Sequence, residues 1–202
     1  MADTTNVPSA ALEDAFRRGL ASAGTVLSTM IGRDITLHSP YLGFTPINRV
    51  PELVGGPEAP VVAIYVGVSG SLVGHAVLLF ESECARHLVR LILEEEVPDI
   101  LAPLPQSLVG EVGNVAVSSF LNSLADYTGL KIVPSPPQVV FDMAGAVLSG
   151  ILALVAASSE EVLVVEAGFR QQQEALQGFF LLLPEAASLD TLLTALHRGR
   201  DR

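Results

Sequence analysis

The chain has 202 residues, of which 50% are hydrophobic and 16% charged. This composition excludes an intrinsically disordered chain, because such chains are poor in the apolar residues that form a core. The length suits one large domain or two small ones. Eleven Lys and Arg residues against 22 Asp and Glu residues leave a net charge of -11. A surface of that charge repels a phosphate backbone, so we expect no nucleic-acid partner.

The sequence also bears on the compartment. It contains a single cysteine, Cys84, so an internal disulfide cannot form. Its first residues lack the basic and then apolar order of a signal peptide. The longest apolar run, residues 143–155, is shorter than the roughly 20 residues that a membrane-spanning helix needs, and we interpret it as a buried helix. We therefore expect a cytoplasmic protein that does not insert into a membrane.

The first half of the chain begins with a helix. Apolar residues recur at three- and four-residue steps over residues 12–31, which is typical of one face of an amphipathic helix, and Gly32 follows as a stop signal. The later elements that we expect in this half are a strand over residues 34–42, a long loop over 46–60, a strand hairpin over 61–68 and 72–81, a helix over 82–93 and a connector over 94–105.

The second half repeats this order. A helix over residues 106–128 is followed by Gly129 and by an extended segment, and a shift of 97 residues superposes Gly32 on Gly129 and Pro40 on Pro137. We expect two strands over residues 162–169 and 176–184, which correspond to the strand hairpin of the first half. A helix over residues 189–197 corresponds to the helix over 82–93.

These elements predict an α+β fold. We expect residues 1–202 to form a single domain with an internal pseudo-twofold duplication, repeat 1 covering about 10–95 and repeat 2 about 106–198. Each repeat would contribute a long helix and three strands to one sheet. The strands are too apolar to face water on both sides, so helices should cover at least one face. We expect the two long helices to run antiparallel on the same side of that sheet.

A polar stripe runs along the second long helix. Ser107, Glu111, Asn114 and Ser118 follow at steps of four, three and four residues, which places all four on one helix face. The apolar residues between them, among them Val112 and Val115, would pack on the sheet. Spacing alone favours nothing more than a solvated helix surface.

The residues of this stripe resemble a family signature. The pattern Ser107-x-x-x-Glu111-x-x-Asn114, followed after 22 residues by Pro137, is similar to that of the CheC/CheX/FliY phosphatases of bacterial and archaeal chemotaxis. The duplication, with its Gly-x-x-Ile and its proline after each long helix, resembles the same family. The resemblance spans most of the chain, from about Leu12 to Leu196.

The resemblance implies a function and a partner. Proteins of this family hydrolyse the aspartyl phosphate of a CheY-type response regulator, so the resemblance makes Glu111 and Asn114 the catalytic pair. Asn114 would orient the attacking water, and Glu111 would reach a lysine beside the phosphoaspartate. Ser107 and Ser118 would contact the partner. The divalent metal belongs to the regulator, so we expect this chain to bind no cofactor or metal; its four histidines, at 38, 75, 87 and 197, lack ligand spacing.

The first repeat departs from the pattern. Ala10, Asp14 and Arg17 stand where Ser107, Glu111 and Asn114 stand in the second repeat, and only the proline, Pro40, is kept. An arginine side chain has donors only and cannot accept a hydrogen bond from water. We therefore interpret the first copy as structurally retained and catalytically silent.

Two alternatives stand beside the phosphatase. The first is a non-catalytic scaffold of the same family, which binds a response regulator or a CheD-like deamidase. The second is an α+β ligand-binding domain, which requires a pocket that the sequence does not reveal.

Overall fold

The computed structural model describes residues 10–38, 42–155, 161–171 and 174–199. The helices are α1 (Ala10–Ile31), the short 3-10 helix η1 (Ile47–Arg49), α2 (Val50–Leu53), α3 (Ser82–Leu93), α4 (Pro103–Thr128), α5 (Ala144–Val155) and α6 (Ala186–Gly199). The strands are β1 (Thr36–His38), β2 (Leu42–Pro46), β3 (Pro60–Gly70), β4 (Gly74–Glu81), β5 (Ile132–Pro134), β6 (Gln138–Met143), β7 (Glu161–Gln171) and β8 (Glu174–Pro184). The predicted α+β class is confirmed.

All the strands of the described residues join one antiparallel sheet. Its order is β1-β7-β8-β4-β3-β5, with β2 pairing along β7 and β6 along β3. The two halves of the chain meet at the central pair, β4 with β8. Each half also places its edge strands on a long strand of the other half, since β1 and β2 pair with β7 while β5 and β6 pair with β3.

The prediction of three strands in each repeat is wrong, because each half of the chain contributes four strands to the sheet. The single strand expected over residues 34–42 is replaced by the short β1 and by β2, which begins at Leu42. In the second half, Pro136 and Pro137 separate β5 from β6. Proline has no backbone N–H to donate to a strand ladder, so one edge position is occupied by two short strands.

The long loop expected over residues 46–60 is also corrected. It contains the end of β2, η1 and α2. Proline is tolerated in the first turn of a helix, and Pro51 lies there in α2. Val50 and Val54 are fully buried at the two ends of α2, so burial of apolar side chains stabilises this turn of helix despite the prolines around it.

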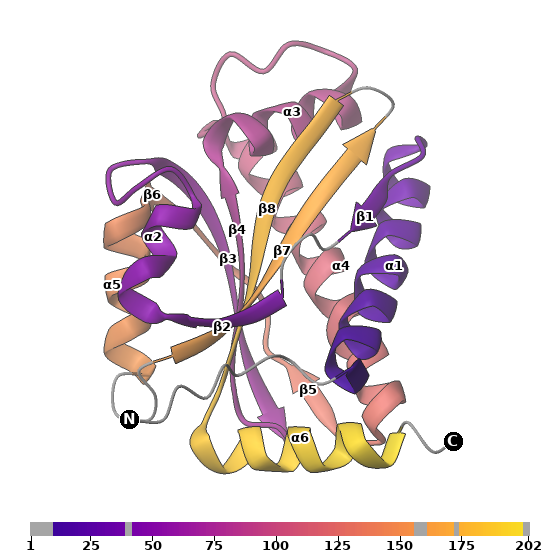
Figure 1. The fold of residues 1–202 in the computed structure, drawn as a ribbon. Coiled ribbons are helices and arrows are strands. Elements are labelled where there is room, and N and C mark those ends of the chain that lie inside the picture. The colour runs from indigo at the N-terminus through magenta and orange to yellow at the C-terminus, as the bar shows by residue number, and fades with distance from the viewer. Residues whose placement is uncertain (1–9, 39–41, 156–160, 172–173, 200–202) are drawn as a thin grey trace.

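Helices cover both faces of the sheet (Figure 1). Alternate residues of β3 point to opposite sides: Val62 and Ile64 join the core under α1, α3, α4 and α6, whereas Val61 and Ala63 join the core under α2 and α5. The run 143–155 forms the predicted helix, α5. Over residues 144–151, whose side chains are described, Val147, Leu148 and Ile151 are buried against the sheet while residues 146, 149 and 150 are exposed. No helix in the described part of the chain is both long and apolar enough to cross a membrane.

The two long helices pack against each other on one side of the sheet and run antiparallel (Figure 1). Phe16 of α1 meets Phe120 of α4 with ring centroids 4.9 Å apart, and the guanidinium of Arg18 lies 5.5 Å from the ring centroid of Tyr127. Both helices end on a glycine at φ 70°, Gly32 and Gly129. The predicted spacing of 97 residues thus recurs in backbone geometry. Superposition of the halves stays a prediction, and Pro40 lies outside the described residues.

The contact between α4 and β3 requires a residue without a side chain at Gly113. A Cβ at this position would lie 2.4 Å from Cγ1 of the fully buried Ile64. We expect Gly113→Ala to lower the free energy of unfolding by about 1–3 kcal/mol, because the core cannot absorb an added methyl group without shifting. Urea unfolding followed by circular dichroism measures this change.

Gly150→Ala is the matched control, because Gly150 is a helical glycine of α5 with open space where its Cβ would be. This variant should be as stable as the parent or up to about 1 kcal/mol more stable. Equal stability of the two variants would contradict the close packing of α4 on β3.

Candidate functional site on the outer face of α4

The helix α4 starts three residues earlier than the sequence predicts. Pro103 occupies its first turn, where the fixed φ of proline suits a helix and the missing N–H costs no hydrogen bond. The N–H of Gln106 donates to the carbonyl of Ala102 at 3.1 Å. At the other end, the N–H of Gly129 donates to the carbonyl of Ala125 at 2.7 Å and closes the helix.

The four residues of the polar stripe lie on the side of α4 that faces away from the core. Ser107 and Glu111 are exposed, and Asn114 and Ser118 are half-buried. The opposite side of the helix is buried and packs in the larger core, through Val109, Val112, Gly113, Ala116, Val117 and Phe120. Val112 points inward as predicted, whereas Val115 is only partly buried at the flank of the stripe.

Hydrogen bonding distinguishes Asn114 from Glu111. The hydroxyl of Ser118 donates to Oδ1 of Asn114 at 3.4 Å, which ties the amide to the next turn of the helix. Among the described residues, none forms a hydrogen bond or an ion pair with the carboxylate of Glu111. The site thus offers a free acceptor group and, one turn away, an amide that both donates and accepts.

Two glycines allow this segment of α4 to lie close to the sheet. A Cβ on Gly110 would lie 3.2 Å from Cγ2 of Val139 in β6, and Gly113 lies against Ile64 in β3. The backbone that carries Glu111 and Asn114 therefore rests directly on two strands. Pro137 immediately precedes β6, the strand below Gly110, and is half-buried.

The corresponding positions of α1 are arranged differently. Arg17 and Arg18 both form ion pairs with the carboxylate of Asp14, Arg18 at 2.9 Å. The hydrogen bond from Arg18, joined by that from Arg17, holds the pKa of Asp14 below its ordinary value. The negative charge at this position is therefore neutralised within the chain, in contrast to that of Glu111.

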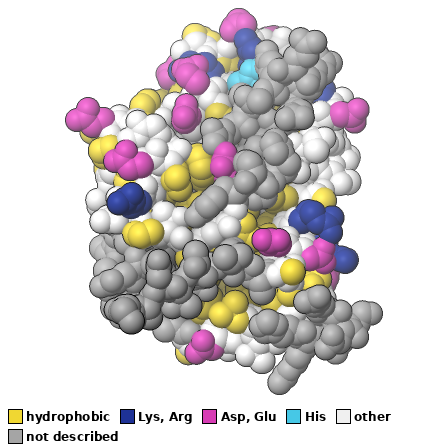
Figure 2. Space-filling model, in the orientation of Figure 1, with side chains coloured by type: hydrophobic (Ala, Val, Ile, Leu, Met, Phe, Trp, Pro, Cys, Tyr) yellow, Lys and Arg dark blue, Asp and Glu magenta, His cyan; other side chains and the backbone are white. Residues whose placement is uncertain are grey.

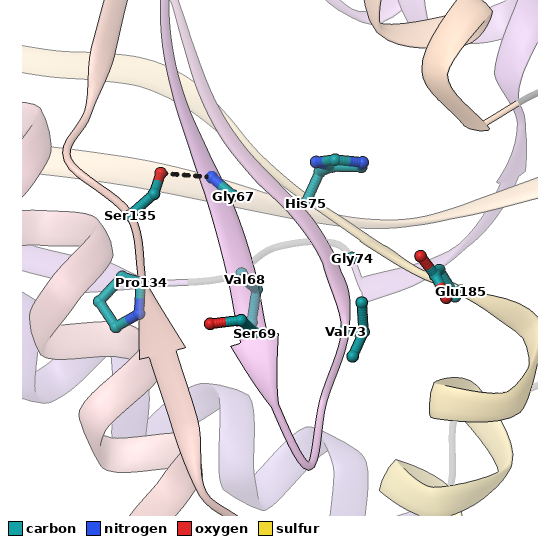
Figure 3. A pocket seen from close by; sticks show the side chains of 9 residues that line it. All are labelled: Gly67, Val68, Ser69, Val73, Gly74, His75, Pro134, Ser135 and Glu185. Atoms are coloured by element: carbon teal, nitrogen blue, oxygen red, sulfur yellow. Dashed lines mark hydrogen bonds between the residues drawn. The ribbon is translucent and has the colours of Figure 1, made fainter.

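An open pocket of about 280 Å³ lies away from the stripe, around the end of the β3–β4 hairpin (Figure 3). Ser135 borders it on one side and Glu185 on the other, and Ser135 Oγ accepts a hydrogen bond from the N–H of Gly67 at 2.9 Å. His75 lines the pocket, and its ring nitrogen Nδ1 lies 2.5 Å from the hydroxyl of Tyr65. Burial lowers the pKa of His75, although the charge of Glu185 opposes this shift. Sequence patterns did not indicate this pocket, because its lining comes from four separate segments.

The charged side chains of the described residues can be followed on one face of the molecule. On the face drawn in Figure 2, the visible Lys and Arg side chains stand apart or beside acidic ones. In the parts of the chain that the structure describes, no group of three or more His, Cys, Asp or Glu side chains could hold a metal ion. The side chains of His38 and His197 lie outside that description.

The sequence of this chain is similar to those of chemotaxis phosphatases. The family model described as "Chemotaxis phosphatase CheX" matches residues 62–155, which include Glu111, Asn114 and Pro137. The CheY-P phosphatase CheC of Bacillus subtilis is 27% identical over 184 residues, which are 88% of each protein.

Solved structures share the fold. FliY of Thermotoga maritima matches with a TM-score of 0.75 and 19% identity, over 96% of this chain and 98% of that one. The CheX-CheY-BeF3-Mg complex from Borrelia burgdorferi matches with a TM-score of 0.56 and 18% identity, over 83% of this chain and 96% of that one. The chain is therefore similar in sequence to the chemotaxis phosphatases CheX and CheC and in fold to FliY and CheX, which confirms the resemblance predicted from its Ser107, Glu111, Asn114 and Pro137 pattern.

Proposed function

We propose that this chain accelerates hydrolysis of the aspartyl phosphate on a CheY-type response regulator through a single site, formed by Glu111 and Asn114. The observation that carries the proposal is the position of this pair one turn apart on the outer face of α4, over a backbone seated on β3 and β6. A partner as large as a receiver domain reaches only such surface groups. The activity named for the Bacillus subtilis relative and for the matching family supports the same reaction.

The reaction is a hydrolysis of a mixed anhydride. The oxygen of a water attacks phosphorus, the bond from phosphorus to the aspartate oxygen breaks, and inorganic phosphate and the free carboxylate result. The water proton leaves with phosphate or to solvent. Enzymes catalyse such transfers mainly by positioning and by charge stabilisation. A divalent ion and a lysine of the regulator would supply the charge, so this chain needs to supply only position.

Asn114 is the residue that would position the water. An amide oxygen has two lone pairs, so Oδ1 can accept a hydrogen bond from water while it accepts the one from Ser118. The hydroxyl of Ser118 thereby limits rotation of the amide. Ser118, expected to touch the partner, is in our proposal a positioning residue for Asn114.

Glu111 would anchor the complex. Glu111 lies about 4.5 Å along the helix axis from Asn114, at a rise of ~1.5 Å per residue. A lysine beside the phosphoaspartate could donate to the carboxylate of Glu111, which is a charge-assisted hydrogen bond. Ser107, one turn further toward the start of α4, extends the same contact surface.

A single site follows from the difference between the two long helices. The carboxylate of Asp14 is already paired with two arginines, and Arg17 stands in the place of the water-positioning amide. The loss of the motif from the first copy shows that this site can be lost while the helix is kept. It therefore supports a second candidate function, in which the chain is a non-catalytic module that binds a regulator. A CheD-like deamidase remains the second candidate partner.

Asn114→Ala should lower the single-turnover rate of dephosphorylation at saturating enzyme by at least about a hundredfold, while equilibrium binding of the regulator changes little. The amide is needed to orient water and not to hold the complex. Release of phosphate from a CheY-type regulator charged with acetyl phosphate measures the rate. Asn122→Ala is the matched control, because Asn122 is an exposed asparagine of the same helix.

Glu111→Ala should reduce both the rate and the binding, because it deletes a charge-assisted contact. If Asn114→Ala dephosphorylates the regulator as fast as the parent, the mechanism is wrong. If both variants and the parent bind the regulator but none speeds phosphate release, the non-catalytic module is the correct function.

Asp14→Ala and Arg17→Ala should leave the rate of phosphate release within about twofold of the parent. Their charges compensate each other on a helix surface away from the proposed site. The same phosphate-release assay, with Glu111→Ala as the positive control, tests this expectation. A loss as large as that of Glu111→Ala would show that the first copy engages a regulator or a CheD-like partner.

A further inference from the structure

Two large apolar side chains are exposed just before the polar stripe. Leu101 is 54% exposed and Leu104 is 57% exposed, the highest values among the large hydrophobic residues that the structure describes. Leu101 directly precedes Ala102, the residue that caps α4, and Leu104 lies in the first turn, so both are exposed at the start of one helix. Neighbouring exposed apolar side chains of this size are a feature of interaction sites. We propose that Leu101 and Leu104 form an apolar docking contact for the phosphorylated regulator, next to its phosphoaspartate. This inference rests on the proposed function.

The segment that presents the two leucines is held in place. Val97 and Ile100 are 4% and 6% exposed and anchor the connector in the core. The guanidinium of Arg86 donates to the carbonyl of Val97 at 2.7 Å and to that of Pro98 at 3.0 Å.

The side chain of Asp99 secures the next turn, since its Oδ1 accepts a hydrogen bond from the N–H of Leu101 at 2.9 Å. A contact residue on a pre-ordered segment loses little conformational entropy when a partner binds. The connector therefore presents its leucines as a ready-made surface, without a folding step.

Leu104 continues the side of α4 that carries the polar stripe. Leu104 lies seven residues before Glu111, which is two helix turns and places both residues on the same side of α4. Their separation along the helix axis is about 10 Å at a rise of ~1.5 Å per residue. A typical interface covers roughly 800 Å² on each partner, so a regulator that contacts Glu111 also covers Leu104.

Charge selects the regulator over a second copy of this chain. The connector carries exposed acidic side chains at residues 94–96 and 99. Glu94 pairs with Arg33 at 3.1 Å and Glu96 with Arg90 at 3.7 Å, whereas residues 95 and 99 form no ion pair with another described residue. The leucines thus have an acidic rim. A regulator surface with an apolar centre and a rim of Lys or Arg complements it, whereas a second copy with its own charge of -11 would be repelled.

The test separates docking from chemistry. Leu101→Ala and Leu104→Ala, singly and together, are assayed with an acetyl-phosphate-charged CheY-type regulator. We expect the double variant to raise the half-saturating regulator concentration at least tenfold, because it removes the apolar surface of two leucines that the regulator would bury. The rate at saturation should stay within about twofold of the parent. Leu104 lies in the first turn of α4 and Leu101 in the turn before it, and both side chains are exposed, so their truncation should preserve folding.

Val140→Ala is the matched control. Val140 of β6 is 41% exposed and pairs with Ala63 of β3. Ala63 belongs to the core under α2 and α5, so the side chain of Val140 is on the face of the sheet opposite to α4. This variant should change neither the half-saturating regulator concentration nor the rate at saturation. Binding of the regulator activated with beryllofluoride and Mg²⁺, measured by titration calorimetry, gives a readout that does not depend on catalysis. Leu104→Met should restore most of the affinity.

Each outcome decides one question. An active parent whose half-saturating concentration is unchanged in the double leucine variant overturns the docking contact and leaves the proposed function intact. A parent without activity overturns the proposed function. A double variant that alters the sedimentation of the chain alone and not regulator binding shows that the leucines serve self-association, which also overturns the docking contact.

Discussion

The architecture depends on the exchange of edge strands between the two halves of the chain. The first half places β1 and β2 on β7, and the second half places β5 and β6 on β3. Without its partner, each half would leave the backbone groups of a long apolar strand unpaired. The central pairing of β4 with β8 joins the same two halves a second time. The two halves therefore share one sheet, and the single domain over residues 1–202 stays a prediction.

This exchange also places the candidate site. Because β6 lies beside β3, α4 can rest on both strands through Gly110 and Gly113, and the side of α4 with Glu111 and Asn114 then faces outward. Packing of α1 against α4 brings a second long helix to the same layer. The two helices differ in surface chemistry: α1 neutralises Asp14 with two arginines, whereas the carboxylate of Glu111 is left available.

The proposed reaction explains why a helix surface can suffice where most enzymes use a pocket. When the partner itself carries the reactive phosphate, its metal ion and its lysine, the second protein needs only to add a positioned amide and a docking surface. The pocket around His75 and Ser135 lies outside that surface and has no part in the proposed chemistry. The connector beside α4, with its two buried anchors and two exposed leucines, lies next to the site and extends the proposed contact surface.

Local patterns in the sequence were sufficient for the long helices, the paired strands β3, β4, β7 and β8, and the stripe from Ser107 to Ser118, because periodicity and terminal glycines act within a few residues. The division of each edge strand, the turn of helix at Val50 and the one-sided burial of α5 depended on which strands lie alongside. So did the exposure of Leu101 and Leu104. The ion pairs of Asp14 are different, because Arg17 and Arg18 follow it by three and four residues on the same helix. Strand exchange and burial join residues that are distant along the chain, and spacing within a segment carries no information about such contacts.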